Sequence, residues 1–502
     1  MSARILGPVI APPMELVELV RELRDIETSG TLSTPVGDIQ CRLYKVKPGD
    51  IFAAVIDYYR DDHSLIQDAI DQGAVAVLLS KTPKTPLSVP WVRTNDVGAV
   101  LGQLSSRRYQ APAEELDIVG VTGTNGKTTT TCLVEAICAS SSRRAGRIGT
   151  LGLVFDGAIE AAEVLSTPEP PVLHRALRAM VQEGADTVAM EVTSHGISMG
   201  RVNDCPFKIR ILTGIGHDHL DYHKTVAAYA ATKVNWMLEA LPNLGEFVVA
   251  PVDDPFAKEI LERFGDRAAS FGFSENATIH PVSIDLHESG IRGTLSTPCG
   301  DVDFTSPLIG RHNLRNVMAA VAASVFLEIP LPDIAQGLAN ISVVPGRLEP
   351  IENDRGFTIL VDYAHTPDAL EAMLSSVREF AKGRLALVLG CGGDRDTSKR
   401  PIMARIASEK AEFVVLTTDN ARSEPPERIL FEMKKGLASR AGSESITELD
   451  RREAIRQALR WARRGDVVII AGKGHESVQV LDGREFYFDD RQVIREILLE
   501  LR

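Results

Sequence analysis

A segment that starts at residue 120, GVTGTNGKTTTT, places three glycines, one lysine and a run of hydroxyls between an apolar strand pattern and an amphipathic helix pattern. The N-terminus of a helix exposes unpaired N–H groups and a positive dipole end, which favours bound phosphate. The glycines let the backbone approach a ligand, Lys127 reaches toward β- and γ-phosphates, and the Thr128 hydroxyl suits Mg²⁺. The loop is a variant, because Val121 stands where the general signature has glycine. An ordinary glycine turn gives no reason for a lysine and a hydroxyl at the helix start, so we predict a nucleoside triphosphate site.

Two further segments carry side chains that suit a metal. AMEVTSHG places Glu191 inside an otherwise apolar strand, where an ionised carboxylate is costly unless it is paired or bound to metal. GIGHDHLDYHKT supplies His217, His219 and His223 directly after the next strand. Their spacing is not a strong zinc signature, and no cysteine assists. Beside a phosphate loop and a buried glutamate, Mg²⁺ is the better interpretation.

The composition bounds the class of protein. The chain has 502 residues, of which 44% are hydrophobic and 25% charged, as expected of a globular protein with about three domains. A net charge of −13 disfavours nucleic acid as the main partner, so we expect small-molecule substrates. The six scattered cysteines contain no C-x-x-C pair, which fits a reducing cytoplasm. No apolar run is long enough to span a bilayer, and we expect neither a signal peptide nor membrane insertion.

Buried-strand runs alternate with helical patterns from about residue 111 to the end, which indicates parallel α/β architecture. The predicted strands end in polar or glycine-rich residues and span 116–123, 186–194, 207–215, 246–254, 357–365, 384–393, 412–420 and 466–474. Ligands bind at the carboxyl ends of strands in such sheets, so the chemistry is expected there. Two connecting segments have the composition of domain boundaries. They predict three domains, at 1–110, 111–344 and 345–502.

Ten motifs, in this order along nearly the whole chain, resemble the Mur ligases of peptidoglycan synthesis, and within them the MurE-type ligases. They are GVTGTNGKTTT (120–130), MEVTSHG (190–196), HDHLDYH (217–223), YAATK (229–233), RHNLRNVMAA (311–320), PGRLE (345–349), VDYAHTPDAL (361–370), GCGGDRDTSKRPIM (390–403), DNARSEPP (419–426) and AGKGHE (471–476). The resemblance implies a smaller α/β N-terminal domain that binds UDP-MurNAc, a central P-loop ATPase domain with a parallel sheet, and a Rossmann-like α/β C-terminal domain that binds an amino acid.

The implied activity is a cytoplasmic, monomeric ATP-dependent ligase. It phosphorylates the terminal carboxylate of UDP-MurNAc-L-Ala-D-Glu, and an amino acid's amine then displaces phosphate. Cations and N–H donors are needed because one anion must attack another. The resemblance assigns catalysis to Lys127, Glu191, His219 and Lys233, and Mg²⁺ to Thr128, Glu191, His219 and Lys233. Lys233 is implied to be a carbamate (N6-carboxylysine), because an ammonium cannot ligate a metal; without the motif it reads as a solvated helix-surface lysine.

The remaining implied contacts fall into three groups. ATP binding is assigned to Gly123, Thr124, Asn125, Gly126, Lys127, Thr128, Thr129, Asn313, Asn316, Arg347 and Asp362. UDP-MurNAc-dipeptide binding is assigned to Ser166, Thr167, Thr193 and Arg201, and the amino-acid pocket to Arg395, Asp419, Asn420, Arg422, Gly472 and Glu476. Arg422 favours meso-diaminopimelate over L-lysine, because a guanidinium pairs with the second carboxylate that lysine lacks. Ala421 replaces the proline usual in that motif, which loosens the loop without removing its charge.

The first domain departs most from the family. RLYK (42–45) stands where D-S-R-x is common near the uridine nucleotide. Outside the first domain, Met199 stands where glutamine is common between the TSH motif and Arg201. Two other functions remain as alternatives: a folylpolyglutamate-synthase-like ligase, and a noncatalytic nucleotide-binding scaffold. The extra N-terminal domain and the DNAR and GKGHE motifs argue against the first. The complete set of implied catalytic residues argues against the second.

Overall fold

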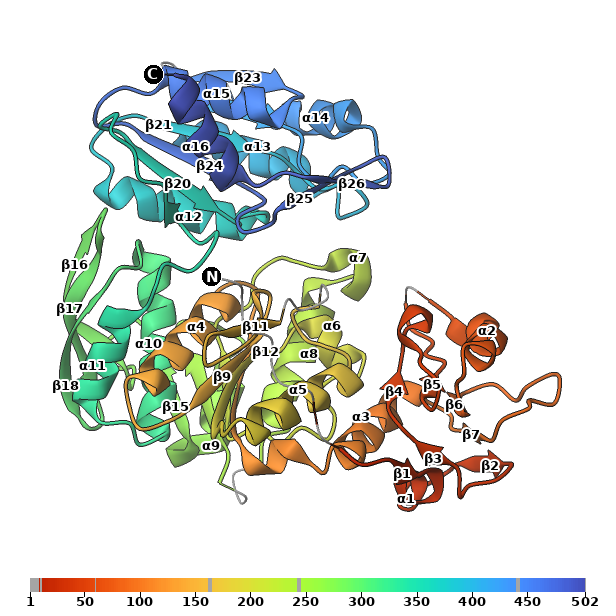
Figure 1. Cartoon of the computed structure of the whole chain (residues 1–502). Helices are drawn as coiled ribbons and strands as arrows, with labels where there is room; N and C mark the ends of the chain where they lie inside the picture. The colour runs from red at the N-terminus through yellow and green to blue at the C-terminus, as the bar shows by residue number, and fades with distance from the viewer. Residues whose placement is uncertain are drawn as a thin grey trace.

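The strands of the chain form three main sheets, one in each part of the sequence, and the parts are distinct in Figure 1. The structure is a computed structural model and describes residues 9, 11–58, 60–160, 165–241, 245–438 and 443–501. No described sheet crosses residue 110 or 344, so we keep the three predicted domains as a proposal. They are called the N-terminal, central and C-terminal parts below.

The N-terminal part is built on a five-stranded sheet in the order β2-β7-β6-β5-β4. Its strands are β2 (Glu27–Ser29), β4 (Ile39–Gln40), β5 (Ile51–Ala53), β6 (Ala76–Leu79) and β7 (Trp91–Arg93), and β1 (Met14–Glu15) pairs separately with β3 (Pro35–Val36). The helices are α1 (Leu16–Val20), α2 (Ile66–Asp71) and α3 (Val97–Arg108). All pairings from β4 to β7 are parallel, so this part is α/β as expected.

The central part contains an eight-stranded sheet in the order β11-β10-β9-β12-β8-β13-β14-β15. The strands are β8 (Asp117–Thr122), β9 (Ala145–Gly149), β10 (Gly152–Phe155), β11 (Ala158–Glu160), β12 (Thr187–Glu191), β13 (Ile209–Leu212), β14 (Phe247–Pro251) and β15 (Ala268–Phe271). The run from β9 to β15 is parallel, and β10 and β11 add an antiparallel edge. The four strands predicted here exist, but each is shorter than predicted because its polar end is already loop.

Helices cover both faces of this sheet and close two hydrophobic cores. One core packs against α4 (Lys127–Ala139), α10 (Arg311–Phe326) and α11 (Leu331–Asn340). The other packs against α5 (Pro170–Gln182), α8 (Val226–Leu238) and α9 (Lys258–Phe264). The shorter helices α6 (Ser194–Ser198) and α7 (Leu220–His223) follow the ends of β12 and β13. Burial of both faces explains why the central strands read as continuous apolar runs.

A three-stranded antiparallel sheet interrupts the alternation that the sequence predicts. It consists of β16 (His280–His287), β17 (Gly290–Thr297) and β18 (Gly300–Ser306), and it stands at the edge of the central part in Figure 1. Side chains along β18 alternate between buried and exposed. Such half-exposed strands lack the long apolar run by which a buried parallel strand is recognised.

The C-terminal part contains a six-stranded sheet in the order β19-β20-β24-β21-β22-β23, antiparallel only at β19. Its strands are β19 (Glu349–Pro350), β20 (Thr358–Asp362), β21 (Leu385–Leu389), β22 (Phe413–Thr417), β23 (Glu444–Glu448) and β24 (Val467–Ala471), and β25 (Val478–Leu481) pairs with β26 (Arg484–Tyr487). One face packs against α12 (Pro367–Phe380), α13 (Lys399–Lys410) and α14 (Pro426–Lys434), and the other against α15 (Arg451–Trp461) and α16 (Asp490–Glu500). All four strands predicted here exist.

A buried ion pair fixes the end of β24. Arg451 and Asp490 are fully buried and joined by two contacts of 2.8 and 2.7 Å. Arg451 also donates to the carbonyl of Ala471, the last residue of β24, at 3.0 Å. Removing one partner of such a pair leaves an uncompensated buried charge, so the pair holds this strand end in place.

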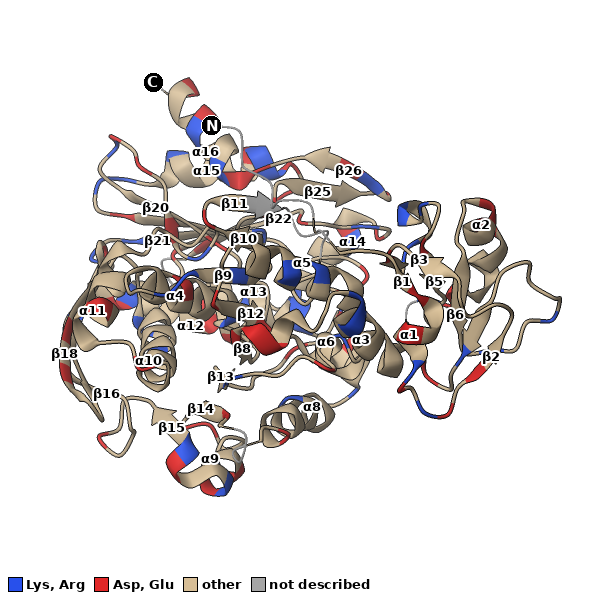
Figure 2. Cartoon of the chain, turned by 60° about the horizontal axis from the view of Figure 1, so that its bottom comes forward, with Lys and Arg blue, Asp and Glu red and all other residues tan. Residues whose placement is uncertain are grey.

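Acidic and basic residues are interspersed along the elements of all three parts (Figure 2). Residues of both signs thus occur in every part, with a net charge of −13 over the whole chain. Within the described ranges, no helix has both the length and the apolar character needed to cross a bilayer.

Candidate functional site

The predicted phosphate loop lies between β8 and α4, at the carboxyl edge of the central sheet. Gly123 and Gly126 have φ values of 143° and 89°, a region that glycine adopts readily. A Cβ on Gly123 would lie 1.9 Å from the Thr213 hydroxyl, and one on Gly126 would lie 2.3 Å from the Asn316 amide oxygen. Both glycines are therefore required by backbone conformation and by close approach.

Lys127 folds back over this loop. Its Nζ donates to the carbonyls of Gly123 and Thr124 at 2.8 and 2.9 Å. Burial lowers the pKa of Lys127, although Glu191 and Asp218 oppose that effect. The amine therefore lies at the mouth of the loop and at the N-terminus of α4, and the charges of Glu191 and Asp218 act on it without a direct contact among the described ion pairs. Thr129 follows on the same helix and is buried.

Thr124 ties the loop to the rest of the central part. Its hydroxyl lies 3.0 Å from the Tyr229 hydroxyl and accepts from the Gly216 N–H at 2.8 Å. The carbonyl of Asn125 accepts from Thr213 at 2.5 Å. Sequence reasoning did not identify Tyr229, whose contact with the loop spans 105 positions.

Glu191 ends β12 and is 1% exposed. Its Oε1 accepts from the Thr150 N–H at 2.8 Å, and its Oε2 accepts from the Thr150 hydroxyl at 3.1 Å. A Cβ on Gly149 would lie 2.4 Å from the same carboxylate. The carboxylate is thus held by the turn between β9 and β10, a partner that the sequence did not reveal.

Lys233 is a buried residue of α8 and is 1% exposed, so it is not a solvated lysine of the helix surface. Its Nζ donates to the Thr122 hydroxyl at 3.2 Å and to the Gly123 carbonyl at 3.0 Å. It also lies 4.9 Å from the centroid of the Tyr229 ring. Burial, with a further effect from Lys127, lowers the pKa of Lys233 well below its usual value. The neutral amine is the form that reacts with CO₂.

The three predicted histidines do not share one site. The ring of His219 lies 4.7 Å from His195, and the ring of His223 lies 5.8 Å from His195, between centroids. His217 instead points to Asp396 of the C-terminal part, 3.6 Å away. In the part of the chain that the structure describes, no group of three or more His, Cys, Asp or Glu side chains is placed to hold a metal ion. A three-histidine zinc site is therefore not formed.

His195 was not identified from the sequence, and its environment is unusual. Burial lowers the pKa of His195 to about 4, and His219, His223 and Arg201 contribute in the same direction. Burial also lowers the pKa of His219, while Asp218 opposes the shift. Both imidazoles are thus kept neutral, the form in which a ring nitrogen binds a cation.

Asn313 and Asn316 lie on the first turns of α10 and are buried. Asn316 donates to the Asn313 amide oxygen at 3.1 Å, and Asn313 donates to the Ile309 carbonyl at 2.8 Å. As the approach to Gly126 shows, Asn316 packs directly against the phosphate loop. The two amides are thus held together beside the loop.

Arg347 brings the C-terminal part to the phosphate loop. Its Nη2 donates to the Thr128 hydroxyl at 3.1 Å across 219 positions, and its guanidinium lies 4.9 Å from the centroid of the Tyr363 ring. Asp362 has a different position: its two oxygens accept from the N–H groups of Leu348 and Ala364 at 2.7 and 2.8 Å. Asp362 therefore fixes the backbone of the connecting segment beside Arg347.

The four residues assigned to the sugar-peptide form one hydrogen-bonded chain with Glu191. The hydroxyls of Thr167 and Thr193 lie 3.0 Å apart, and Thr167 donates to the Glu191 carbonyl at 2.9 Å. Arg201 donates to the Thr167 carbonyl at 3.2 Å. Ser166 joins this chain through Thr150, because the hydroxyl oxygens of Ser166 and Thr150 lie 2.6 Å apart.

A cavity of about 280 Å³ lies between the N-terminal and central parts, beside Arg201. It is lined by Tyr58, Arg60, Glu169, Met199, Arg201 and Tyr222 among others. Arg42, the first residue of the atypical RLYK segment, and Arg60 both contact Glu169, at 3.1 and 2.7 Å. The atypical segment therefore contributes a charge at this boundary rather than facing away from it.

The proposed amino-acid pocket lies where β22 and β24 end. Asn420 donates to Glu476 at 2.7 Å, and Asp419 lies beside Gly472, where a Cβ would be 2.5 Å from its carboxylate. Burial lowers the pKa of Arg422, and Arg395 adds to that effect. The pocket therefore combines the guanidinium of Arg422, which senses the charge of Arg395, with the buried carboxylate of Asp419 and the half-buried carboxylate of Glu476. Arg395 is exposed and donates only to the Asp394 carbonyl, at 3.3 Å, among the contacts described.

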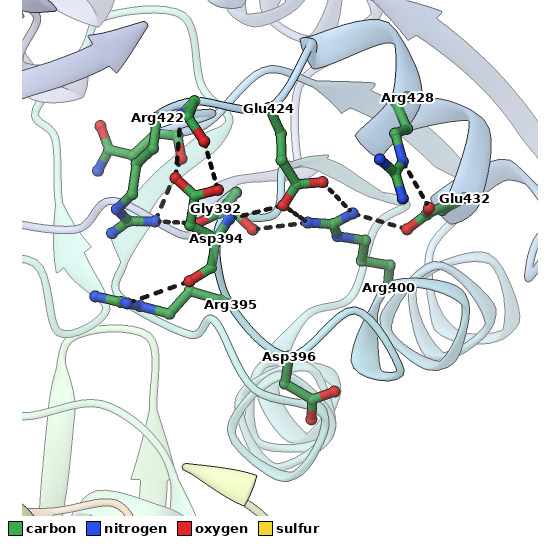
Figure 3. A network of polar contacts seen from close by, with 12 residues as sticks. Gly392, Asp394, Arg395, Asp396, Arg400, Arg422, Glu424, Arg428 and Glu432 are labelled. Carbon is green, nitrogen blue, oxygen red and sulfur yellow. Dashed lines mark hydrogen bonds and ion pairs between the residues drawn. The ribbon is translucent and has the colours of Figure 1, made fainter. Parts of the chain in front are cut away.

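A buried arginine holds the two loops of this pocket together (Figure 3). Arg400 is fully buried and donates to Glu424 at 2.7 Å and to Glu432 at 2.7 Å. Glu424 also accepts from the Asp394 N–H at 2.7 Å, and Asp394 accepts from the Ser423 hydroxyl at 2.7 Å. The loops that carry Arg395 and Arg422 are thus fixed to each other. None of these partners was identified from the sequence.

Comparisons with known proteins agree with this architecture. Two family models match: the Mur ligase middle domain over residues 121–324, and the Mur ligase glutamate ligase domain over residues 346–474. A protein of Geobacter metallireducens named UDP-N-acetylmuramoyl-L-alanyl-D-glutamate–2,6-diaminopimelate ligase is 38% identical over 507 residues, covering 97% of this chain and 99% of that protein. A solved structure of the same name has a TM-score of 0.67 at 30% identity, covering 97% and 99%.

The folylpolyglutamate synthase of Mycobacterium tuberculosis has a TM-score of 0.60 at 20% identity and covers 73% of this chain and 91% of that chain. This likeness shows a shared fold alone. The family models and the full-length identity to the Geobacter protein confirm the resemblance that the motifs predicted: the chain belongs to the Mur ligase family.

Proposed function

We propose that this chain joins meso-diaminopimelate to UDP-MurNAc-L-Ala-D-Glu with the energy of ATP, as a cytoplasmic monomer. The observation that carries the proposal is the contact of Arg347 with Thr128, at 3.1 Å. This contact joins the predicted phosphate loop to the C-terminal part, which contains Arg395, Arg422 and Glu476. The names of the full-length relatives favour this reaction over the folylpolyglutamate alternative.

The chemistry proceeds in two steps. An oxygen of the substrate's terminal carboxylate attacks the γ-phosphorus of ATP, the bond to the bridging oxygen breaks, and ADP leaves. The amine then attacks the acyl carbon, phosphate leaves, and the amine loses a proton. Lys127 and the loop N–H groups stabilise the charge that gathers on the γ-phosphate in the first step. Thr124, Asn125 and Thr129 complete the loop, and Asn313, Asn316, Arg347 and Asp362 are proposed to border the nucleotide.

The residues around Glu191 fit Mg²⁺. A buried carboxylate, neighbouring hydroxyls and the buried Lys233 amine form an oxygen-rich set once that amine, whose pKa is lowered, has reacted with CO₂. Thr128, Glu191, His219 and the Lys233 carbamate would hold the ion. When bound, Mg²⁺ neutralises phosphate charge. Forming the carbamate makes one N–C bond and releases one proton, which a lysine with a lowered pKa permits.

The chain of hydroxyls from Ser166 to Thr193, together with Arg201, is proposed to orient the sugar-peptide. Arg201 lies both on this chain and on the 280 Å³ cavity. A guanidinium there can pair with an anionic group of the substrate. The cavity lies between the N-terminal and central parts, so the sugar nucleotide would contact both.

Arg422 is expected to set the choice of amino acid. Changing Arg422 to alanine should lower the preference for diaminopimelate over lysine by about 100-fold, because the carboxylate that lysine lacks loses a charged partner. The preference is measured as the ratio of kcat/KM values for the two amino acids. Arg460→Ala, an exposed arginine of α15 on the opposite face of the sheet, serves as control. An unchanged ratio in Arg422→Ala would contradict the assignment.

Glu476 should make binding of the amino acid sensitive to pH. Burial and Asp419 raise the pKa of Glu476, so it takes up a proton at a higher pH than an exposed glutamate. We expect KM for diaminopimelate to rise on the acid side, as the negative partner of its distal ammonium is lost. Glu476→Gln should raise KM about tenfold at neutral pH and flatten the acid-side rise.

The same shift affects folding. Because the pKa of Glu476 is raised in the folded protein, its contribution to folding stability is present below the unfolded pKa and is lost as pH rises through the folded pKa.

The control for the KM prediction is Glu485→Gln, on the exposed strand β26, which should keep the wild-type pH profile of KM. An acid-side rise that persists in Glu476→Gln would assign it to another group.

The direct test incubates the protein with ATP, Mg²⁺, UDP-MurNAc-dipeptide and either diaminopimelate or lysine. The tripeptide product is identified by mass. We expect the diaminopimelate product to dominate. Equal incorporation of lysine would contradict the specificity, and activity on a folate acceptor alone would contradict the proposed reaction.

A further inference from the structure

One short segment of the central part contacts both other parts of the chain. This bridging segment, residues 216–224, contains α7 and the proposed metal residue His219. Figure 1 shows α7 standing out from the central part toward the C-terminal part, with the N-terminal part on its other side. Two of its non-glycine residues, His219 and Lys224, have positive φ values of 52° and 67°. Such conformations persist only where surrounding contacts impose them.

The contacts with the C-terminal part hold His217. Asp368, in the first turn of α12, accepts from the His217 N–H at 2.7 Å. The approach is close, because a Cβ on Gly216 would lie 2.3 Å from the same carboxylate oxygen. Asp396 lies 3.6 Å from the His217 ring. Asp396 belongs to the loop of Arg395, the proposed amino-acid contact.

The contacts with the N-terminal part hold the other end of the segment. The Tyr58 hydroxyl donates to the Asp221 carbonyl at 3.5 Å, and its ring packs edge-on against Tyr222 with centroids 5.2 Å apart. Lys224 donates to the Tyr58 hydroxyl at 3.4 Å. His219 therefore lies between two sets of contacts, one from each flanking part.

We propose that Asp368 and Asp396 are positioning residues, which place His219 through His217 when the C-terminal part docks, and that Tyr58 holds the same segment from the N-terminal part. This inference rests on the proposed function, which places the sugar nucleotide, ATP and the amino acid on three different parts. The bridging segment then makes formation of the catalytic arrangement depend on the docking of all three. Neither Asp368 nor Tyr58 needs to touch the reacting atoms for this role.

The test separates a hydrogen bond from a general effect on folding. Asp368→Ala removes the acceptor and should lower kcat about tenfold, with KM for ATP changed less than about twofold. Asp368→Asn keeps an oxygen that accepts from the His217 N–H, and should retain kcat within about threefold of wild type. Asp333→Ala is the matched control, because Asp333 also follows a proline in the first turn of a helix, α11.

Equal losses in Asp368→Ala and Asp368→Asn would overturn the proposal, as would an equal loss in Asp333→Ala. A lower melting temperature that accounts for the whole loss in Asp368→Ala would do the same. The bridging role is tested by the double variant Tyr58→Ala with Asp368→Ala. Distant sites act additively, so a combined loss in kcat smaller than the product of the single losses supports one shared element, and additivity overturns it.

The ratios of kcat between each variant and the wild type are measured with whichever amino acid the wild-type protein incorporates. If the wild type joins lysine instead of diaminopimelate, the proposed specificity fails, yet the ratios still decide the positioning role. If the wild type makes the diaminopimelate product and Asp368→Ala matches it in kcat, the positioning role fails alone.

Discussion

Changing Lys233 to methionine is expected to lower kcat for amide formation by about 10³-fold, while the free energy of unfolding stays the same or rises. The loss of rate corresponds to about 4 kcal/mol of transition-state stabilisation. Methionine has similar length but can form no carbamate, so the proposed Mg²⁺ site loses an oxygen ligand. The free energy of unfolding is not expected to fall with the rate, because burial disfavours the charged form of Lys233, whose pKa is lowered well below its usual value. An apolar side chain carries no such cost.

This pair of measurements distinguishes catalysis from folding. A structural role for Lys233 predicts a lower melting temperature together with the lower rate. Lys258→Met provides the control, because Lys258 lies on α9 with 79% of its side chain exposed and should change neither quantity. The carbamate has its own readout: protein equilibrated with ¹³CO₂ should give a carbamate carbon signal in NMR that Lys233→Met lacks. Wild-type protein with no such signal would refute the modification.

Eight of the fourteen strands in the central and C-terminal sheets could be predicted, because both faces of each sheet are buried there. Their apolar runs in sequence, such as the run that becomes β24, need no knowledge of neighbours to be recognised. The strands β9, β10, β11, β15, β19 and β23 lie outside the predicted ranges. The strands β16 to β18 follow a different rule, because one side of each faces solvent. Their polar and apolar residues alternate over short lengths, and this signal is easily lost among loops.

The residue types of the candidate site could be predicted, but most of their partners could not. Lys127 and Glu191 stand at strand or helix ends, where local sequence indicates chemistry. Their environment comes from residues far away along the chain: Thr150 holds Glu191 from 41 positions away, and Arg347 reaches Thr128 across 219. Local patterns carry no record of such pairings. The family resemblance supplied Lys233, whose burial on α8 no periodicity of that helix indicated.

Several specific contacts join the three parts of the chain. Arg347 reaches the phosphate loop, Asp368 reaches the bridging segment, and Tyr58 reaches its far end. In each of these three contacts, at least one partner lies in a loop. Contacts of this kind form and break at low cost, which suits an enzyme that must admit and release three substrates. Lys127 directly precedes Thr128, the residue that Arg347 contacts, so its removal gives the most direct test of the phosphate chemistry.

Changing Lys127 to methionine is expected to lower kcat by about 10³-fold, with a much smaller change in ATP affinity. The N–H groups of the loop and of the α4 N-terminus remain and still bind phosphate. What disappears is the positive group at the γ-phosphate, where negative charge accumulates as one anion attacks another. In the structure the Lys127 amine contacts only the carbonyls of Gly123 and Thr124 among its described hydrogen bonds, so it is held at the loop without an ion-pair partner to displace.

Quenched time-course assays that measure ADP release and amide formation separately show which of the two steps is slowed. Both rates should fall together in Lys127→Met, because the lysine acts when the acyl phosphate forms, before the amine attacks. Lys434→Met, at the exposed end of α14, removes the same charge far from the loop and should keep both rates. A variant that releases ADP at the wild-type rate but forms no amide would place Lys127 in the second step. Undiminished amide formation would remove the lysine from the chemistry altogether, and with it the electrostatic account of how this ligase activates a carboxylate.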